Sequence, residues 1–463
     1  MTTTETTATG QRDDLPSDVA GWLELDRQYR IPGRYDISQV LVRGEGVRVW
    51  DADGKEYIDF ESGQVCTSTG HCHPAYTQAI IDQAKTLVQT GSGYTSPARV
   101  KLAKKLAEIM PGNLERSYFA CTGSEATEVA LRLAKLYTGR SEIVSLQRGY
   151  HGMTHASLSV TGLGGKFKAI PGSGLLGNVF IPAPYAYRNP FPGAAEGDDM
   201  DFFRQGMETI NWTSTGKPAA IILEVVMSVG GMIVPSKAYV QAVRKWCDET
   251  GALMIIDEAQ SGVGRTGKWF AIEHFDVVPD IITTSKSLGG GIPLCGVTTT
   301  REIAERAAEL GFHQSSSHTD DPFLAAVGLA HVEILENEGL VQNAADEGGY
   351  LKNALEGFRD RYDIVGDVRG LGMMLGIEIV TDKASKTASP LHATAISQYC
   401  RDNGLLLGHR PTGAVSGNVI RILPPLTLNR EESDQALAIL EAAIQHAQKS
   451  VEITEADGTG WMK

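Results

Sequence analysis

The sequence predicts an α/β fold built on a large, mainly parallel sheet, and two observations lead to this expectation. From about residue 76 to 325, amphipathic helical patterns alternate with short apolar runs that end in polar residues, the pattern of repeated β-α-β units. The chain also has 463 residues, which is too many for one compact core. We therefore expect a large sheet domain beside a smaller α+β domain that is made from both ends of the chain.

Charged or polar side chains follow three of the apolar runs, at the point where each predicted strand ends. The side chains are Glu224, Asp257 and Lys286. Ligands of such sheets bind at the carboxyl ends of the strands, so these three groups are expected at one edge of the sheet. The three runs span residues 219–223, 253–256 and 281–284.

The segments outside the sheet domain show a different pattern. Residues 47–60 predict a hairpin with Asp53 and Gly54 at its turn. Helical patterns at 330–338 and 350–361 lead to apolar runs at 373–380 and 418–426, which are expected to be strands. The expected division is a polar tail with a leading helix (1–34), the first part of the small domain (35–75), the large domain (76–325) and the rest of the small domain (326–463).

Composition narrows the class of protein. The 56 acidic and 42 basic side chains leave a net charge of -14, which argues against nucleic acid as a partner. No apolar run has the length of a membrane span, and the polar N-terminus lacks the features of a targeting signal. The six cysteines have no framework spacing, so we expect reduced thiols and a cytoplasmic protein.

Two groups of residues suggest zinc only weakly. Cys66, His71, Cys72 and His73 are close in sequence, but their spacing matches no zinc motif. His151 and His155 have the four-residue spacing of zinc ligands on a helix, but the glycine that follows His151 weakens a helix there. We therefore expect no zinc site.

A well-specified helix start lies at residues 122–125. Thr122 can cap the helix with Glu125 in a capping box, and Gly139 can end the helix. The first turn offers N–H groups from Gly123 and Ser124, an arrangement that favours a phosphate group. Many turns of this kind serve only as caps, so the signal is weak by itself.

The segment LMIIDEAQSGVGRTG brings Asp257 to the end of a strand, ahead of a glycine-rich loop. A carboxylate beside a pyridine nitrogen keeps that nitrogen protonated, as pyridoxal phosphate (PLP) chemistry requires. Gln260 could then reach the ring hydroxyl. The alternative is a solvated or salt-bridged aspartate.

The segment TTSKSLGGGIPLCG places Lys286 among small residues and three consecutive glycines. A lysine that forms a Schiff base needs an unhindered amine with a lowered pKa, and it can then act as a general acid or base. A single lysine is more often a surface residue. A shared sheet edge with Asp257 and a phosphate turn makes the catalytic interpretation the better one.

The two segments together resemble the class III (subgroup II) PLP-dependent aminotransferase family of fold type I, whose pattern the chain follows from about residue 35 to 445. The resemblance implies PLP as cofactor, a seven-stranded sheet, and a homodimer or tetramer with shared active sites. Lys286 and Asp257 are the implied catalytic residues. By the same resemblance, Ser317 donates to the phosphate across the dimer interface and Tyr150 stacks on the ring. The implied cofactor-binding residues are Thr122, Gly123, Ser124, Tyr150, Glu224, Asp257, Gln260, Lys286 and Ser317.

Substrate binding is implied by Arg421, which matches the family's carboxylate-binding arginine; its planar guanidinium suits a carboxylate. The expected partners are a small amino donor and a keto-acid acceptor. The segment EVVMSVGG, which begins at Glu224, departs from the proline and glycine-rich turn that many members carry there. Ordinary transamination of an amino acid or ω-amine, a PLP lyase, a racemase and a non-catalytic PLP-binding protein remain alternatives.

A finer resemblance is to members of the family that decarboxylate 2,2-dialkylglycines, and the segments SGQVCTSTGHCHP, YHGMT, IPAPYAYR and IRILPPLT carry it. It implies decarboxylation coupled to transamination with pyruvate, with Gln64 holding the carboxylate that leaves perpendicular to the ring. Tyr150 replaces a tryptophan of that pattern, and Met153 is retained on the substrate side. The same resemblance implies a structural alkali-metal ion bound by Ser92, Ser317, Thr319 and Asp321.

Overall fold

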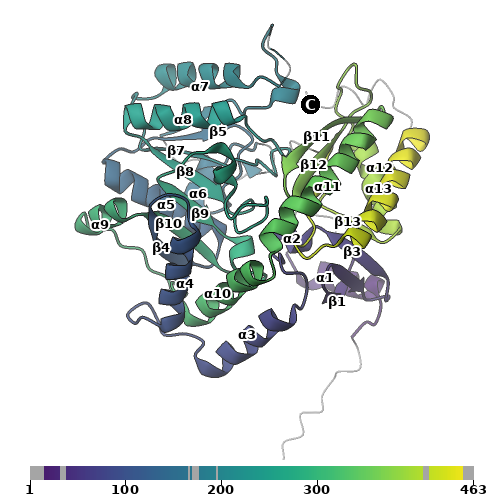
Figure 1. Cartoon of the computed structure of the whole chain (residues 1–463), viewed down its shortest axis with the longest axis horizontal. Coiled ribbons are helices and arrows are strands. Elements are labelled where there is room, and N and C mark those ends of the chain that lie inside the picture. The colour runs from purple at the N-terminus through teal and green to yellow at the C-terminus, as the bar shows by residue number, and fades with distance from the viewer. Residues whose placement is uncertain are drawn as a thin grey trace, which may run out of the picture.

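The computed structural model describes residues 15–31, 38–164, 167–168, 177–193, 195, 197–409 and 417–451. Within these residues the chain forms a large domain around one sheet and a smaller domain beside it (Figure 1). The small domain combines strands from near the N-terminus with strands and helices of the C-terminal part of the chain.

A seven-stranded sheet forms the centre of the large domain. The strands from β9 to β6 pair in parallel, and β10 runs antiparallel to both of its neighbours, β4 and β9. The mainly parallel sheet predicted from the sequence is therefore confirmed. The order is β4 (Leu114–Ala120), β10 (Cys295–Thr300), β9 (Ile281–Thr284), β8 (Leu253–Glu258), β7 (Ala220–Leu223), β5 (Ile143–Leu146) and β6 (Asn178–Ile181).

Helices cover both faces of this sheet. In β7, Ala220 and Ile222 face the cluster that contains helix α5 (Gly123–Thr138). Ile221 and Leu223 face the opposite cluster, which contains helix α8 (Lys237–Thr250). Because successive side chains of a strand point to opposite faces, a strand buried on both sides has a continuous apolar sequence. This is why the three apolar runs predicted β7, β8 and β9 correctly.

Two sheets form the small domain. One has the order β1 (Leu41–Glu45), β2 (Arg48–Asp51), β3 (Glu56–Phe60) and β13 (Leu405–Leu407), and the other has β11 (Val365–Leu371), β12 (Met374–Ile379) and β14 (Val419–Ile422). The predicted hairpin is the pair β2 and β3. The strand expected over 418–426 ends at Ile422 because Pro424 and Pro425 lack the N–H groups that a ladder needs.

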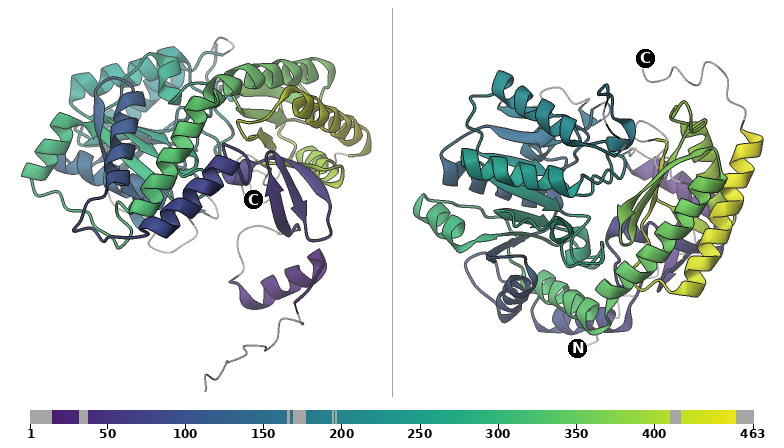
Figure 2. Two further views of the ribbon diagram at one scale, coloured as in Figure 1. Left: turned by 60° about the horizontal axis from the view of Figure 1, so that its bottom comes forward. Right: turned by 45° about the horizontal axis from the view of Figure 1, so that its top comes forward.

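The remaining elements surround the two sheet systems. The two views in Figure 2 show the small domain beside the large one, with the long helix α13 on the outer side of the small domain. The helices are α1 (Val19–Tyr29), α2 (Ser62–Val65), α3 (Pro74–Thr86), α4 (Pro97–Ile109), α6 (His155–Val160), α7 (Met200–Thr213), α9 (Arg301–Glu309), α10 (Pro322–Asn337), α11 (Leu340–Arg361), α12 (Pro390–Asp402) and α13 (Arg430–Ser450), with short 3-10 turns η2 (Ala186–Arg188), η3 (Ala271–Phe275) and η4 (Lys286–Leu288).

The expected helices at 330–338 and 350–361 lie within α10 and α11 and are longer than predicted. The expected domain boundary at residue 325 falls inside α10, which packs on α3 and α4. The division into domains stays a prediction. Among the described residues, no helix combines the length and the apolar character needed to cross a membrane.

Candidate active site

A cavity of about 380 Å³ lies at the carboxyl ends of the central strands, within the size range of small-molecule sites. Its walls come from the ends of β7, β8 and β9 and from the first turn of α5. The structure therefore brings together the groups that the sequence predicted at this edge. The predicted residues in the wall are Thr122, Gly123, Ser124, Tyr150, Glu224, Asp257, Gln260 and Lys286.

Asp257 is the second-last residue of strand β8 and is buried. Its Oδ2 accepts a hydrogen bond from Nδ1 of His151 at 2.8 Å, and its Oδ1 accepts from the hydroxyl of Thr283 at 3.1 Å. Burial by itself raises the pKa of Asp257, but the hydrogen bond from His151 and the positive charge of Lys286 outweigh it and leave the pKa below its ordinary value. Asp257 is therefore an anion at neutral pH, suited to a cationic partner.

Lys286 follows β9 and begins the short turn η4. Burial lowers the pKa of its amine, although Asp257, Cys66 and Glu224 oppose that effect. The backbone of Lys286 has φ +34°, a sparsely populated conformation for a residue with a side chain. A lowered pKa increases the fraction of neutral amine, the form that a nucleophilic lysine needs.

Glu224 follows β7 and is also buried. The pKa of its carboxyl is raised to about 7, mainly by burial; His151 opposes this shift, and the nearby Asp257 adds to it. One carboxyl oxygen accepts the backbone N–H of Tyr150 at 2.8 Å, so Glu224 fixes the segment that carries Tyr150. The ring of Tyr150 lies 5.6 Å from that of Phe167, centroid to centroid.

The start of α5 forms another wall. The capping box between Thr122 and Glu125 is present, and Gly139 ends the helix in the left-handed conformation, as predicted. The hydroxyl of Ser124 accepts the backbone N–H of Met153 at 3.1 Å. The first-turn N–H groups of a helix favour an anion, so Gly123 and Ser124 are suitably placed for a phosphate.

The cavity residues fit PLP. Among the residues that line the cavity, two buried polar atoms have no hydrogen-bond partner in the described parts of the chain: Oε1 of Gln260 and Nε2 of His151. Buried polar atoms are normally satisfied, so orphaned atoms beside a cavity indicate a group that binds there. An anionic aspartate, a half-buried lysine and a helix N-terminus supply partners for the ring nitrogen, the aldehyde and the phosphate.

Arg421 lies on β14, outside the cavity wall but close enough to Lys286 to lower its pKa. Its Nε donates to the carbonyl oxygen of Gly408 at 3.1 Å, and its Nη1 to the hydroxyl of Ser228 at 3.3 Å. These two contacts anchor the guanidinium beside the cofactor cavity.

Besides Arg421, three residues predicted to bind the cofactor or substrate do not line the cavity of this chain. Gln64 is exposed in the turn of α2, where its φ is +58°, and Met153 is 46% exposed. Ser317 is exposed, and its carbonyl oxygen accepts from Gln89 at 2.5 Å. The roles predicted for these residues stay predictions.

The expected alkali-metal ligands lie in two neighbouring segments. The hydroxyl of Ser315 contacts that of Ser92 at 3.3 Å, which joins the segment of Ser92 to the segment that holds the other three residues. Thr319 and Asp321 are buried, and Oδ1 of Asp321 has no hydrogen-bond partner in the described parts of the chain. Nothing in the described residues groups three or more His, Cys, Asp or Glu side chains as a metal site.

Sequence reasoning missed two contributors to the site. His151 was considered only as a zinc ligand, whereas its ring binds Asp257. Ser228 was part of a segment noted only as a departure from the family pattern, whereas its hydroxyl binds Arg421. Both partnerships join residues far apart in sequence, so the only local sign was the position of each residue beside a predicted site segment.

The sheet, the lysine that lines the cavity at its edge and the aspartate beside it define a PLP-dependent enzyme. Residues 32–444 match the family described as Aminotransferase class-III, and the chain belongs to that family, whose members use PLP. A probable 4-aminobutyrate aminotransferase of Bacillus subtilis is 37% identical over 92% of this chain and 98% of its own length. A leucine/methionine racemase of Thermococcus litoralis is 36% identical over 88% of this chain and 90% of its own.

Solved structures agree with this assignment. An amine transaminase from an uncultivated Pseudomonas species, solved with PLP bound, superposes with a TM-score of 0.82 at 32% identity, over 89% of this chain and 96% of its own. These relatives support the family and fold that the sequence predicted. They give no specific support to the finer resemblance to 2,2-dialkylglycine decarboxylases.

Proposed function

We propose that this enzyme transfers the amino group of a carboxylate-bearing amino compound to a keto acid. Bound PLP supplies an electron sink for a bond at the substrate's Cα. Lys286 holds and moves the proton at that carbon, Asp257 keeps the ring nitrogen charged, and Arg421 binds the carboxylate. The observation that carries the proposal is the anchored guanidinium of Arg421 beside the cavity that contains Lys286.

The test is a donor panel with the purified, PLP-loaded protein. Pyruvate and 2-oxoglutarate are the acceptors, and the donors are an α-amino acid, 4-aminobutyrate and an aromatic amine without a carboxylate. We expect formation of alanine or glutamate, with a lower KM for the carboxylated donors. Racemisation of an amino acid without amino transfer would contradict the proposal and favour the racemase alternative.

Decarboxylation coupled to transamination is a second candidate. The observation in its favour is the place of Gln64, two residues before Cys66, which lines the cavity. With 2-aminoisobutyrate and pyruvate the expected products are acetone, CO2 and alanine in equal amounts. Gln64→Leu should reduce CO2 release and leave cofactor binding unchanged. Failure to form CO2, together with transamination of ordinary donors, would exclude this candidate.

The proposed assembly is a homodimer or a tetramer. This proposal rests on Ser317, which is exposed and lies outside the cavity of its own chain. We propose that Ser317 contacts the phosphate of the PLP that a second copy of the chain binds. Light scattering coupled to size-exclusion chromatography measures the assembly. A monomer with full activity would exclude the shared site.

A further inference from the structure

A row of three residues crosses the second sheet of the small domain. Arg369 on β11 pairs with Gly376 on β12, and Gly376 pairs with Arg421 on β14. Residues directly opposite each other on adjacent strands place their side chains on the same face. The row therefore has two arginines on one face, separated by a position that has no side chain.

A loop of the large domain fills the space over Gly376. A Cβ built on Gly376 would lie 2.6 Å from the Cβ of Met232, closer than non-bonded carbon atoms approach. Met232 belongs to the loop 227–233, which follows β7 and is closed by paired backbone hydrogen bonds between Met227 and Ile233. The loop is thus seated between the two arginines, and glycine at 376 makes this close approach possible.

The same loop contacts both arginines of the row. At one end, the hydroxyl of Ser228 accepts from Nη1 of Arg421 at 3.3 Å. At the other end, the carbonyl oxygen of Gly231 accepts from Nε of Arg369 at 2.9 Å, and that of Gly230 accepts from Nη1 of Arg148 at 3.2 Å. Arg369 and Arg421 are therefore linked through four residues of one short loop.

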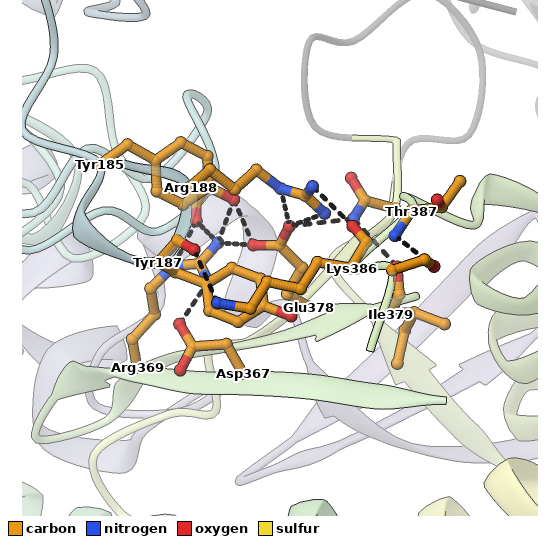
Figure 3. Close-up of polar contacts among 12 residues, drawn as sticks. Tyr185, Tyr187, Arg188, Asp367, Arg369, Glu378, Ile379, Lys386 and Thr387 are labelled. Atoms are coloured by element: carbon orange, nitrogen blue, oxygen red, sulfur yellow. Dashed lines mark hydrogen bonds and ion pairs between the residues drawn. The ribbon is translucent and has the colours of Figure 1, made fainter. Parts of the chain in front are cut away.

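Arg369 is itself held in a buried ionic cluster (Figure 3). Its guanidinium contacts Asp367 at 2.7 Å, Glu378 at 2.7 Å and the hydroxyl of Tyr185 at 3.1 Å. Glu378 is fully buried and also accepts from Nε of Arg188 at 2.6 Å. A buried charge network in which the charged groups have partners is rigid, so the guanidinium of Arg369 is a fixed point against which the loop rests.

We propose that Arg369 is a positioning residue for substrate carboxylate: it fixes the loop 227–233 and, through Ser228, sets the orientation of the Arg421 guanidinium. The inference rests on the carboxylate-binding role proposed for Arg421. A planar guanidinium binds a carboxylate well only when its fork faces the two oxygens. Anchoring of Arg421 by Gly408 and Ser228 supplies that orientation, and Arg369 keeps Ser228 in place.

The test compares Ser228→Ala, Arg369→Met and the double variant, with Arg359→Met as the control. Arg359 is a partly exposed arginine on α11 that pairs with Asp360. Isothermal titration calorimetry of the PLP-loaded protein with propionate, an unreactive carboxylate, gives Kd. Kinetics with an amino-acid donor and with an aromatic amine that has no carboxylate give KM and kcat for each.

Loss of a hydrogen bond that orients a charged group is expected to weaken binding about tenfold. Ser228→Ala and Arg369→Met should both raise the Kd of propionate and the KM of the amino acid by that factor, with the KM of the amine within about twofold of the wild-type value. The double variant should be no weaker than Ser228→Ala, because Arg369 acts through Ser228. Additive losses, or an equal loss with the amine, would overturn the proposal.

If Arg369→Met does not fold, Gly376→Ala tests the same link, because it leaves every ionic partner in place and forces Met232 to move. The same selective loss is expected, and unchanged propionate affinity would overturn the proposal. A wild-type protein that binds propionate but does not transaminate contradicts the proposed function alone. A wild-type protein that transaminates amino acids and binds propionate, with an affinity that Ser228→Ala and Arg369→Met leave unchanged, contradicts this inference alone.

Discussion

Nδ1 of His151 lies 2.8 Å from Oδ2 of Asp257, and both side chains are buried. The two residues come from different segments of the large domain, and the carboxylate accepts a hydrogen bond from the ring nitrogen. Because Thr283 and the backbone of Ala259 bind the other oxygen, the plane of the carboxylate is fixed. This arrangement keeps Asp257 ionised and oriented.

Replacing His151 with leucine should therefore weaken the function of Asp257. The loss of the hydrogen bond removes the main factor that lowers the pKa of this carboxyl. A hydrogen bond to a charged group contributes roughly 1.5–3 kcal/mol, so kcat is expected to fall by about tenfold or more and PLP to bind more weakly. His155→Leu, at an exposed position four residues on, is the control, and an equal effect in both variants would contradict the role of His151.

Lys286→Ala should abolish transamination and the absorption band of covalently held PLP. The reason is that Lys286 is the lysine that lines the cavity. Treatment of the wild-type protein with borohydride should fix PLP to the chain, and peptide mass spectrometry locates the adduct. The control is Lys268→Ala, which changes an exposed lysine. An adduct on any other lysine would exclude Lys286 as the carrier.

Glu224→Gln should change how stability depends on pH. Burial raises the pKa of Glu224 to about 7 from 4.5, so between these values the folded chain holds a proton that the unfolded chain releases. The contribution of Glu224 to stability is therefore lost as pH rises from about 4.5 to 7, by about 3 kcal/mol. Urea unfolding at pH 5 and pH 8 should show a smaller loss in Glu224→Gln. Glu258 also has a pKa of about 7, but it is present in both proteins, so its contribution cancels in the comparison. An equal loss of stability between pH 5 and pH 8 in the wild-type protein and in Glu224→Gln would refute the role of Glu224.

Potassium should support activity through the segment that ends at Asp321. The observation behind the expectation is Oδ1 of this buried carboxylate, which has no hydrogen-bond partner within the described segments. Exchange of potassium for lithium is expected to reduce kcat severalfold in the wild-type protein, because the smaller ion draws oxygen ligands closer. In Asp321→Asn, kcat should no longer depend on which of the two cations is present. In Asp360→Asn, at an exposed position, kcat should depend on the cation as in the wild-type protein. An activity that is indifferent to the cation would rule out the ion.

The sequence predicted those parts of the site that local patterns specify. Strands β7 to β9 were predictable because burial on both faces leaves continuous apolar runs, and the capping box at Thr122 is a four-residue signal. The contacts of His151 with Asp257 and of Ser228 with Arg421 were not predictable, because folding alone brings these residues together. The strand expected over 418–426 was predicted too long, because the prediction followed the apolar residues and gave too little weight to Pro424 and Pro425.

The parallel pairing of β13 with β3 sets an order of events during synthesis. Ile58 lies opposite Leu405, so the ribosome must make most of the chain before β3 gains this neighbour. Arg421 emerges later still, whereas the strands of the seven-stranded sheet are complete once Thr300 has been made. Since domains tend to fold as they emerge, the lysine and its aspartate can be in place on a nascent chain that cannot yet hold a substrate carboxylate. A translation product that is truncated before Arg421 is therefore expected to bind PLP but not to catalyse transamination of a carboxylated substrate.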